Sequence, residues 1–383
     1  MKKVAVVTAT RAEYGILRPL ISKLSSEQDI ELQLLVTGTH LSAKYGQTVD
    51  EIVKDGFTIH AQIPILEEGN GAYDVSCTMA NATKRFAEYF AKERPDLLVV
   101  LGDRTEMLGI CCAAMNERIP IAHLHGGELT EGAVDDCVRH AITKMSYLHF
   151  PASEEYRKRI IQLGENPERV MNVGALGVEN ILKTPLLSYD MMCESVGIPK
   201  GRKYVVVTFH PVTLENGTEL EQVDALIEAM CEQDEYFYLI TKANADVGGD
   251  LVNARLETYV SSVENAKLVA SLGMQRYLSA VKYSSFVLGN SSSGIIEAPA
   301  FGVPTVNIGD RQKGRLMAGT VISCEPNTAE IVSAMKKADM IERIPSKLYG
   351  DGNTSEKIVE VIKHFLKNGT VELKKRFHDV EFI

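Results

Sequence analysis

The amino-acid sequence predicts an α/β protein in which two doubly wound domains face a cleft. Three observations support this fold class. Short apolar runs alternate with segments of helical spacing along most of the chain. The 383 residues exceed what one ordinary core accommodates, so two domains of similar size are expected. With 45% hydrophobic and 24% charged residues, the composition is that of a globular protein with a sizeable core.

The N-terminal domain is expected to comprise residues 1–180. Its strands are predicted from continuous apolar runs, which are typical of parallel strands buried on both faces; they lie at residues 4–7, 30–36, 59–65, 96–101, 119–124 and 147–151. Helices are predicted from apolar residues that recur with helical spacing; they lie at residues 16–24, 52–54, 75–93, 104–116 and 135–145. Strand and helix thus alternate through the whole segment.

A second series of the same kind predicts a C-terminal domain at residues 181–365. Its strands are expected at residues 204–209, 236–241, 266–269, 286–288, 304–308 and 319–324. Its helices are expected at residues 220–232, 255–263, 274–280 and 355–365. Residues 366–383 form a charged, weakly periodic tail. Both series are of the Rossmann-like type.

The composition also excludes several classes of protein. A formal charge of −10 argues against nucleic acid or an anionic membrane surface as the main partner. Seven scattered cysteines without a C-x-x-C pair indicate reduced thiols in a cytoplasm, not a disulfide framework or a zinc site. The positive N-terminus leads into a short first strand rather than a signal peptide, and no later apolar run approaches the roughly 18 residues of a membrane helix.

Polar side chains follow the predicted strands of the N-terminal domain, where ligands of open α/β sheets bind. The strand at 96–101 delivers Asp103 and Arg104, and a carboxylate there can serve as a general acid or base, or as a simple cap on the next helix. The next strand is followed by His125 and Glu128, both candidate proton carriers. Gly126 between them permits close backbone approach to a ligand.

Three more segments point to the same edge of this sheet. Asp135 and Asp136 open a helix, where acids are also favoured for purely structural reasons, and Arg139 shares a face with Asp135. Arg11 and His40 follow the first and second strands, although each, taken alone, favours a solvated or structural role. The histidines do not have the spacing of a metal site, so no metal is expected.

The C-terminal domain shows the pattern of a nucleotide site. A run of serines leads from a short strand into a helix, and a helix start favours phosphate. A carboxylate within that helix can hold a ribose, and cations follow the next strand. These candidate nucleotide-binding residues are His210, Asn244, Ser291, Ser292, Glu297, Arg311 and Arg315. Neither G-x-G-x-x-G nor G-x-x-x-x-G-K-[ST] occurs, which argues against NAD and ATP chemistry.

Taken together, the motifs resemble those of a known family. They are TATRAEYG, LGDRTE, GGE with DDCVRHAITK, FHPVT, and GNSSSGIIEAPAFGVPTVNIGDRQKGR, which span nearly the whole chain. In this order they resemble the hydrolysing UDP-N-acetylglucosamine 2-epimerases, the sialic-acid-pathway branch of the sugar-nucleotide epimerases. The resemblance implies a glycosyltransferase-B-type fold, a nucleotide-sugar substrate, no metal or redox cofactor, and a homodimer or homotetramer.

The resemblance also implies roles for individual residues. Around the nucleotide diphosphate it places Arg11, His210, Asn244, Ser291, Ser292, Glu297 and Arg311. Facing the sugar it places Asp103, Asp135 and Asp136, with Arg104 and His40 nearby. Non-hydrolysing relatives have H-R-x-E-N where this chain has His210 followed by Pro-Val-Thr, so the hydrolysing branch is preferred.

One position departs from the family pattern. Relatives that act on UDP-N-acetylglucosamine commonly have Glu before the Gly-Gly, whereas this chain has His125. Either His125 or Glu128 replaces that carboxylate, or the substrate differs. We therefore expect hydrolysis of UDP-N-acetylglucosamine to N-acetylmannosamine and UDP, through C2 deprotonation, a glycal and hydration. The alternative substrate is a UDP- or GDP-linked 2,4-diacetamido-2,4,6-trideoxy-glucose of the legionaminic acid branch; a glycosyltransferase is the alternative of a different class.

Overall fold

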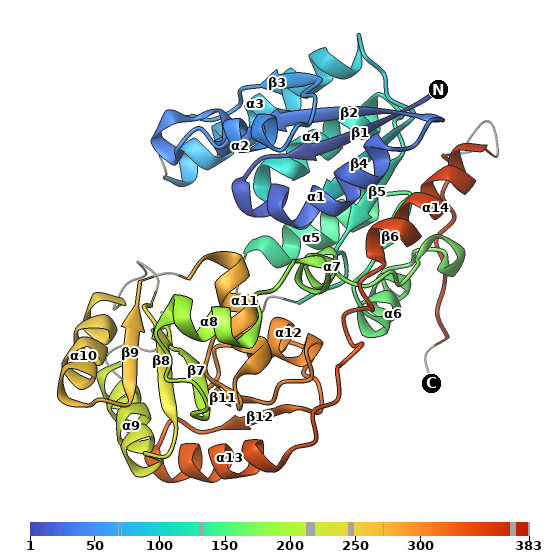
Figure 1. Ribbon diagram of the computed structural model, residues 1–383. Helices are drawn as coiled ribbons and strands as arrows, with labels where there is room; N and C mark the ends of the chain where they lie inside the picture. The colour runs from blue at the N-terminus through green and yellow to red at the C-terminus, as the bar shows by residue number, and fades with distance from the viewer. Residues whose placement is uncertain are drawn as a thin grey trace. The chain divides into compact units, whose positions relative to one another are not determined.

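A computed structural model describes residues 1–67, 69, 71–129, 134–211, 219–243, 249–270, 272–367 and 373–381. The chain forms two compact units (Figure 1). The first comprises Met1–Asn180 with Gly350–Ile383, and the second comprises Ile181–Tyr349. Each unit contains one parallel six-stranded sheet with helices on both faces, which confirms the predicted α/β class.

The sheet of the first unit has the order β3-β2-β1-β4-β5-β6, and every pairing is parallel. Its strands are β1 (Lys2–Thr8), β2 (Ile30–Thr37), β3 (Ala61–Ile63), β4 (Leu97–Leu101), β5 (Ile121–Leu124) and β6 (Leu148–Phe150). All five residues of β4 are buried, as expected for a central strand covered on both faces. The apolar runs in the sequence therefore located these strands well.

Helices cover both faces of this sheet. One face packs against α1 (Arg11–Ser25), α2 (Val49–Lys54) and α14 (Thr354–Lys367). The opposite face packs against α3 (Ala72–Phe90), α4 (Thr105–Asn116) and α5 (Val134–Met145). The remaining helical segments are η1 (Gly38–Leu41), η2 (Ala43–Tyr45), α6 (Glu154–Gln162), η3 (Pro167–Arg169) and α7 (Leu176–Lys183), which runs across the boundary between the units.

Helix α14 corrects the expected extent of the C-terminal domain. The sequence placed residues up to 365 in that domain, but the structure groups everything from Gly350 onward with the first unit. The reason is the strongly amphipathic character of α14: its apolar side, including Ile358 and Ile362, is buried in the core that also contains Leu20 of α1. Lys363 reinforces this packing through ion pairs with Glu27 and Asp29.

The second unit repeats the architecture of the first. Its sheet has the order β12-β11-β10-β7-β8-β9, again all parallel. The strands are β7 (Tyr204–Thr208), β8 (Phe237–Thr241), β9 (Ala266–Val269), β10 (Val287–Gly289), β11 (Thr305–Ile308) and β12 (Val321–Cys324). One face is covered by α9 (Glu219–Glu232), α10 (Gly249–Ser262) and α13 (Thr328–Met340), and the other by α8 (Tyr189–Val196), α11 (Gly273–Tyr283) and α12 (Ser293–Ala300).

The structure contains helices that the apolar pattern did not indicate, namely α6, α7, α8 and α13. Helix α6 buries only Tyr156 and Ile160 among charged residues, and α13 begins at an Asn327 cap that the pattern did not mark. Outside the named strands, Val170 forms an isolated parallel bridge with His149. Among the described residues, no helix is both long and apolar enough to cross a bilayer.

The two sheets share one topological feature that positions the functional residues. In each, the chain starts in the middle, builds outward over three strands, then returns to place the fourth beside the first. The pairs that result are β1 with β4 and β7 with β10. At such a switch point the flanking loops separate and leave a crevice beyond the carboxyl ends of the strands. Ligand-binding side chains are expected there in both units.

Candidate active site

In the first unit, the candidate residues are assembled by one guanidinium. Arg139, on the buried side of α5 and only 4% exposed, donates to the carboxylate of Asp103, which follows β4. Its other terminal nitrogen donates to the main-chain carbonyl of Glu128 at 2.8 Å and to Asp136 at 3.3 Å. Three predicted residues from different segments are thus brought together.

His125 and Glu128 form a second polar pair in the loop after β5. The Nδ1 atom of His125 lies 3.0 Å from the Glu128 carboxylate, and its Nε2 atom is buried without a hydrogen-bond partner. A carboxylate accepts a hydrogen bond, so the Nδ1–H of His125 is the donor in this contact. The backbone of His125 is left-handed, with φ at 61°, which is costly for a residue with a Cβ.

A glycine between these two residues explains the path of the loop. Gly127 is also left-handed, with φ at 80°, and a Cβ there would collide with the carbonyl of Tyr156. Arg159 of α6 donates to the Gly127 carbonyl. Because the chain is held so closely against α6, the strained conformation of His125 is imposed by its surroundings. Such strain is often found at functional sites.

His123 lies within β5 and contacts the residue that precedes Asp103. It is fully buried, and burial lowers its pKa to about 3, so the ring is neutral. Its Nε2 lies 2.7 Å from the Gly102 carbonyl and its Nδ1 lies 3.1 Å from the hydroxyl of Thr143 on α5. Nε2 therefore donates to the residue that precedes Asp103, which fixes the turn that presents this carboxylate.

The first turn of α5 corrects one expectation. Arg139 pairs with Asp136 and Asp103, not with Asp135 as the four-residue spacing suggested, because its side chain turns inward beneath the sheet loops. Asp135 is exposed, and its negative charge acts on Arg104. His140 approaches Asp136 at 3.4 Å. At this helix start, Asp136 therefore points inward to Arg139 and Asp135 is exposed.

Arg11 and Arg104 lie at the carboxyl ends of the central strands. Arg11 is 72% exposed in its side chain and pairs with Glu51 at 3.0 Å. Arg104, the N-cap residue of α4, pairs with the buried Glu106 in the first turn of that helix. Both cations are held by carboxylates at this edge of the sheet.

His40 also lies at this edge, next to Thr8 at the end of β1, but its side chain is buried. It is fully buried, with Nε2 3.0 Å from the Thr8 hydroxyl and Nδ1 2.8 Å from the Thr48 hydroxyl. Burial lowers its pKa to about 4, so it is a neutral bridge between two threonines. The turn responsible begins at Gly38, whose φ of 57° and close approach to Ala9 fold the chain back toward β1.

Glu13 is a buried carboxyl group that the sequence reasoning missed. Its Oε2 accepts from the Ala9 N–H at 3.1 Å, while its own N–H donates to the Thr10 hydroxyl at 3.2 Å. Desolvation raises its pKa to about 7, against the opposing charge of Arg104, and its Oε1 has no partner. The Thr-x-x-Glu spacing of a capping box was the available signal.

In the second unit, Asn290 joins the segments that carry the candidate nucleotide-binding residues. Its amide oxygen accepts from the His210 N–H at 2.8 Å, and its amide nitrogen donates to the His210 carbonyl at 2.7 Å. Its main-chain carbonyl accepts from Arg311 at 3.2 Å and from Gln312 at 2.9 Å. The ends of β7 and β10 and the loop after β11 are therefore joined at one fully buried residue.

The start of α12 carries the serines and a buried acid. The Ser291 hydroxyl accepts from the Ser293 N–H at 3.3 Å, and Ser292 is the N-cap residue without a capping side-chain bond. Tyr277 of α11 donates to the Ser293 hydroxyl at 2.7 Å. Burial raises the pKa of Glu297, partly offset by the charge of Arg315, and its Oε2 lacks a partner. Asn244 lies outside the described residues.

Comparison with known proteins identifies the family. A family model described as UDP-N-acetylglucosamine 2-epimerase matches residues 22–363. The chain belongs to this family. The epimerase also resembles solved structures of the fold: that of a UDP-N-acetylglucosamine 2-epimerase from Neisseria meningitidis, bound to UDP-N-acetylglucosamine, has a TM-score of 0.77 and 18% identity and covers 94% of this chain and 100% of that one.

Relatives of higher identity place the epimerase in the hydrolysing branch. A protein of Campylobacter jejuni named GDP/UDP-N,N'-diacetylbacillosamine 2-epimerase (hydrolyzing) is 40% identical over 85% of each chain. One of Legionella pneumophila named UDP-N,N'-diacetylbacillosamine 2-epimerase (hydrolyzing) is 35% identical over 95% of this chain and 96% of its own length. Escherichia coli polysialic acid biosynthesis protein P7 is 36% identical over 99% of this chain and 98% of its own length. The resemblance that the motifs indicated is confirmed.

Proposed function

We propose that the epimerase hydrolyses a UDP- or GDP-linked N,N'-diacetylbacillosamine, which is 2,4-diacetamido-2,4,6-trideoxy-glucose. The products are the nucleoside diphosphate and the free sugar inverted at C2. The observation that carries this proposal is the 40% identity to the Campylobacter jejuni relative, whose name specifies that substrate. The proposal reverses the order of the sequence-based expectation, which favoured UDP-N-acetylglucosamine. His125, which departs from the pattern expected for that substrate, supports the same choice.

UDP-N-acetylglucosamine is the second candidate substrate. A Neisseria meningitidis relative named UDP-N-acetylglucosamine 2-epimerase is 31% identical over 99% of this chain and 100% of its own length. The two substrates differ at C4 and C6 of the sugar. UDP-N-acetylglucosamine has a hydroxyl at C4 and a hydroxymethyl group at C6, whereas the diacetamido sugar has an acetamido group at C4 and a methyl group at C6. A site built to satisfy one set leaves polar groups unpaired with the other, so strong discrimination is expected.

The proposed reaction begins with removal of the C2 proton. A base takes this proton as the C1–O bond to the diphosphate breaks, and a C1–C2 double bond forms to give a glycal. We assign the base to His125, because Nε2 is unpartnered and Glu128 holds the proton on Nδ1. Glu128 also compensates the imidazolium that forms. The site therefore has the acceptor and the counter-charge that this step needs.

Hydration of the glycal completes the reaction. Water adds its hydroxyl to C1 and a proton is delivered to C2 on the face opposite to that of abstraction. This step needs a second proton carrier, which we assign to the acids Asp103, Asp135 and Asp136. Arg139 fixes Asp103 and Asp136 in one arrangement, as positioned acid–base groups require. One water is consumed and one nucleoside diphosphate is released, so the reaction balances.

The nucleotide is assigned to the second unit and the sugar to the first. At the nucleotide, His210, Ser291 and Ser292 contribute polar groups and Glu297 is available to a ribose hydroxyl through its unpartnered Oε2. Arg311 and Arg315 supply positive charge, and Asn244 is retained from the sequence. A helix start with nearby cations favours the charge of a departing diphosphate. From the family resemblance we also propose a cytoplasmic homo-oligomer, which light scattering and cell fractionation test.

The test is turnover of a substrate panel without any sugar acceptor. The purified epimerase is incubated with UDP- and GDP-linked N,N'-diacetylbacillosamine and with UDP-N-acetylglucosamine, and free sugar and nucleoside diphosphate are quantified. Preferred turnover of a diacetamido substrate is expected, by a kcat/KM ratio of at least ~100-fold. Preferred turnover of UDP-N-acetylglucosamine establishes the second candidate. Turnover only after an acceptor is added contradicts both and indicates a glycosyltransferase.

A further inference from the structure

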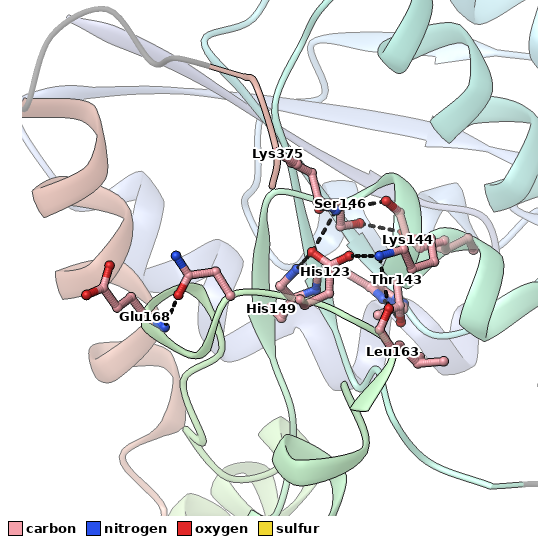
Figure 2. Close-up of polar contacts among 11 residues, drawn as sticks. His123, Thr143, Lys144, Ser146, His149, Leu163, Glu168 and Lys375 are labelled. Atoms are coloured by element: carbon pink, nitrogen blue, oxygen red, sulfur yellow. Dashed lines mark hydrogen bonds and ion pairs between the residues drawn. The ribbon is translucent and has the colours of Figure 1, made fainter. Parts of the chain in front are cut away.

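A buried carboxylate outside the candidate site joins three segments of the first unit. Glu165, in the loop after α6, is 1% exposed. His149 approaches its Oε2 at 3.0 Å, Lys144 its Oε1 at 2.6 Å, and Lys375 its Oε2 at 2.6 Å (Figure 2). Burial opposes its ionisation, but these three hydrogen bonds hold the pKa of Glu165 at about 2. The carboxylate is therefore a charged centre to which residue 375 is firmly bound.

Lys375 also closes the end of α5. Its ammonium group donates to the Lys144 carbonyl at 2.8 Å and to the Ser146 carbonyl at 2.7 Å (Figure 2). The last carbonyls of a helix lack partners within it and carry the negative end of its dipole. A cation placed there donates hydrogen bonds to these carbonyls and offsets the negative end of the dipole. One side chain from the tail thus serves α5 and Glu165 together.

The neighbouring residues hold the same tail segment in place. The ring of Phe377 lies against the ammonium group of Lys144, with 5.1 Å between the nitrogen and the ring centroid. The N–H of His378 donates to the Gly164 carbonyl at 3.0 Å. Residues 373–381, which we term the tail clasp, therefore contact the C-terminal end of α5 and the loop after α6.

The other end of α5 carries the groups to which we assign proton transfer. Arg139 bonds Asp103, and Thr143, next to Lys144, bonds His123, which in turn bonds the Gly102 carbonyl. A helix transmits displacement along its axis because its backbone is rigid. A shift of its C-terminal end therefore moves Arg139 relative to the strand-end loops. Catalytic geometry is sensitive to shifts of about 1 Å.

We propose that Lys375 is a positioning residue of the epimerase, which holds α5 in the register that joins Arg139 to Asp103. The tail clasp then contributes to catalysis through the position of α5. The kinetic part of this inference rests on the proposed function. Its structural part, the immobilisation of α5 by Lys375, is independent of the proposed function.

The test compares Lys375→Met with Lys375→Arg and with Lys374→Met, a control at the exposed neighbouring lysine. Hydrogen exchange is followed by mass spectrometry in residues 134–146 and, as an internal reference, in α13 of the second unit. We expect Lys375→Met to accelerate exchange in α5 alone and to lower kcat about tenfold with KM within about twofold. Lys375→Arg should recover most of both losses, because it keeps the charge and the donors. Lys374→Met should match the wild type.

Two results would overturn the inference. One is wild-type exchange in α5 together with wild-type kcat in Lys375→Met. The other is accelerated exchange of equal size in α5 and α13, which indicates general destabilisation. If Lys375→Met does not fold, Lys375→Gln is read in the same way, since it keeps a donor but loses the charge. If the wild type turns over no nucleotide sugar, the proposed function fails, while the exchange comparison still decides whether Lys375 immobilises α5.

Discussion

The buried guanidinium of Arg139 donates to the carboxylate of Asp103, although the two residues lie 36 positions apart in the sequence. The bond joins α5 to the loop after β4. Because the same guanidinium reaches Asp136 and the Glu128 carbonyl, one side chain sets the mutual geometry of three candidate catalytic segments. The first prediction follows directly from this arrangement.

Arg139→Met should reduce kcat by at least ~100-fold, since displaced catalytic groups lose orientation. Removing one partner of a buried ion pair leaves the other charge uncompensated, but the Asp103 side chain is 27% exposed, so the loss of folding stability should be only about 1–3 kcal/mol. UDP affinity, assigned to the second unit, should not change. Kinetics, thermal denaturation and calorimetric titration with UDP measure these quantities. Unchanged kcat in a folded variant would remove Arg139 from the account.

Substitutions at His125 should separate backbone strain from chemistry. Both His125→Ala and His125→Gly remove the proposed base and should lose at least ~100-fold in kcat. Glycine adopts the left-handed backbone of this position freely and alanine does not, so His125→Gly should be the more stable variant by about 1 kcal/mol. Chemical denaturation measures the difference. Equal stability of the two variants would show that the site does not impose the strain.

Glu13 should make folding stability depend on pH. Its folded-state pKa of about 7 lies above the ordinary value of 4.5, so the stability it contributes is fully present below pH 4.5 and is lost as the pH rises toward 7. Glu13→Gln removes this titration. The variant should therefore gain about 2 kcal/mol over the wild type between pH 5 and pH 8. Denaturation at both pH values measures this gain, and the exposed Glu264→Gln is the control. A gain that does not grow with pH would contradict the burial of an ionisable carboxyl group.

Asn290 should govern nucleotide affinity through the His210 segment. Asn290→Ala leaves the buried N–H and carbonyl of His210 without these partners and should weaken UDP binding about tenfold. The matched control is Asn265→Ala, which removes an amide that also bonds the main chain but precedes β9, at the opposite end of the sheet. Both variants should lose stability, whereas only Asn290→Ala should lose affinity. Equal losses of affinity would point to a general effect.

Much of the fold could be predicted because its strands are covered on both faces. Continuous apolar runs such as that of β4 have one structural explanation, and their alternation with helices fixes a parallel sheet. Helix α6 was missed because only Tyr156 and Ile160 of its residues are buried, which leaves little periodic signal. Helix α13 buries Ile331, Val332, Ala334, Met335 and Ala338 with helical spacing, so the sequence did contain its signal. Helix α14 was recognised, but a helix pattern does not reveal which core receives its apolar side.

The candidate site was predicted less completely. The rule that ligands lie at the carboxyl ends of strands brought Asp103 and Glu128 to one edge of the sheet. It places backbones, not side chains, so it could not show that Arg139 turns inward to Asp103 or that His40 is buried between Thr8 and Thr48. Glu13 was missed because burial, which raises its pKa, depends on tertiary packing.

The central claim is that the epimerase removes the C2 proton of a nucleotide sugar and returns a proton during hydration. The most direct measurement is turnover of UDP-linked N,N'-diacetylbacillosamine in heavy water, with the released sugar examined by NMR and mass spectrometry. The account predicts a free sugar inverted at C2 that carries one deuterium at that carbon, released together with UDP. Release of UDP with a sugar that retains its C2 proton and configuration would contradict the account.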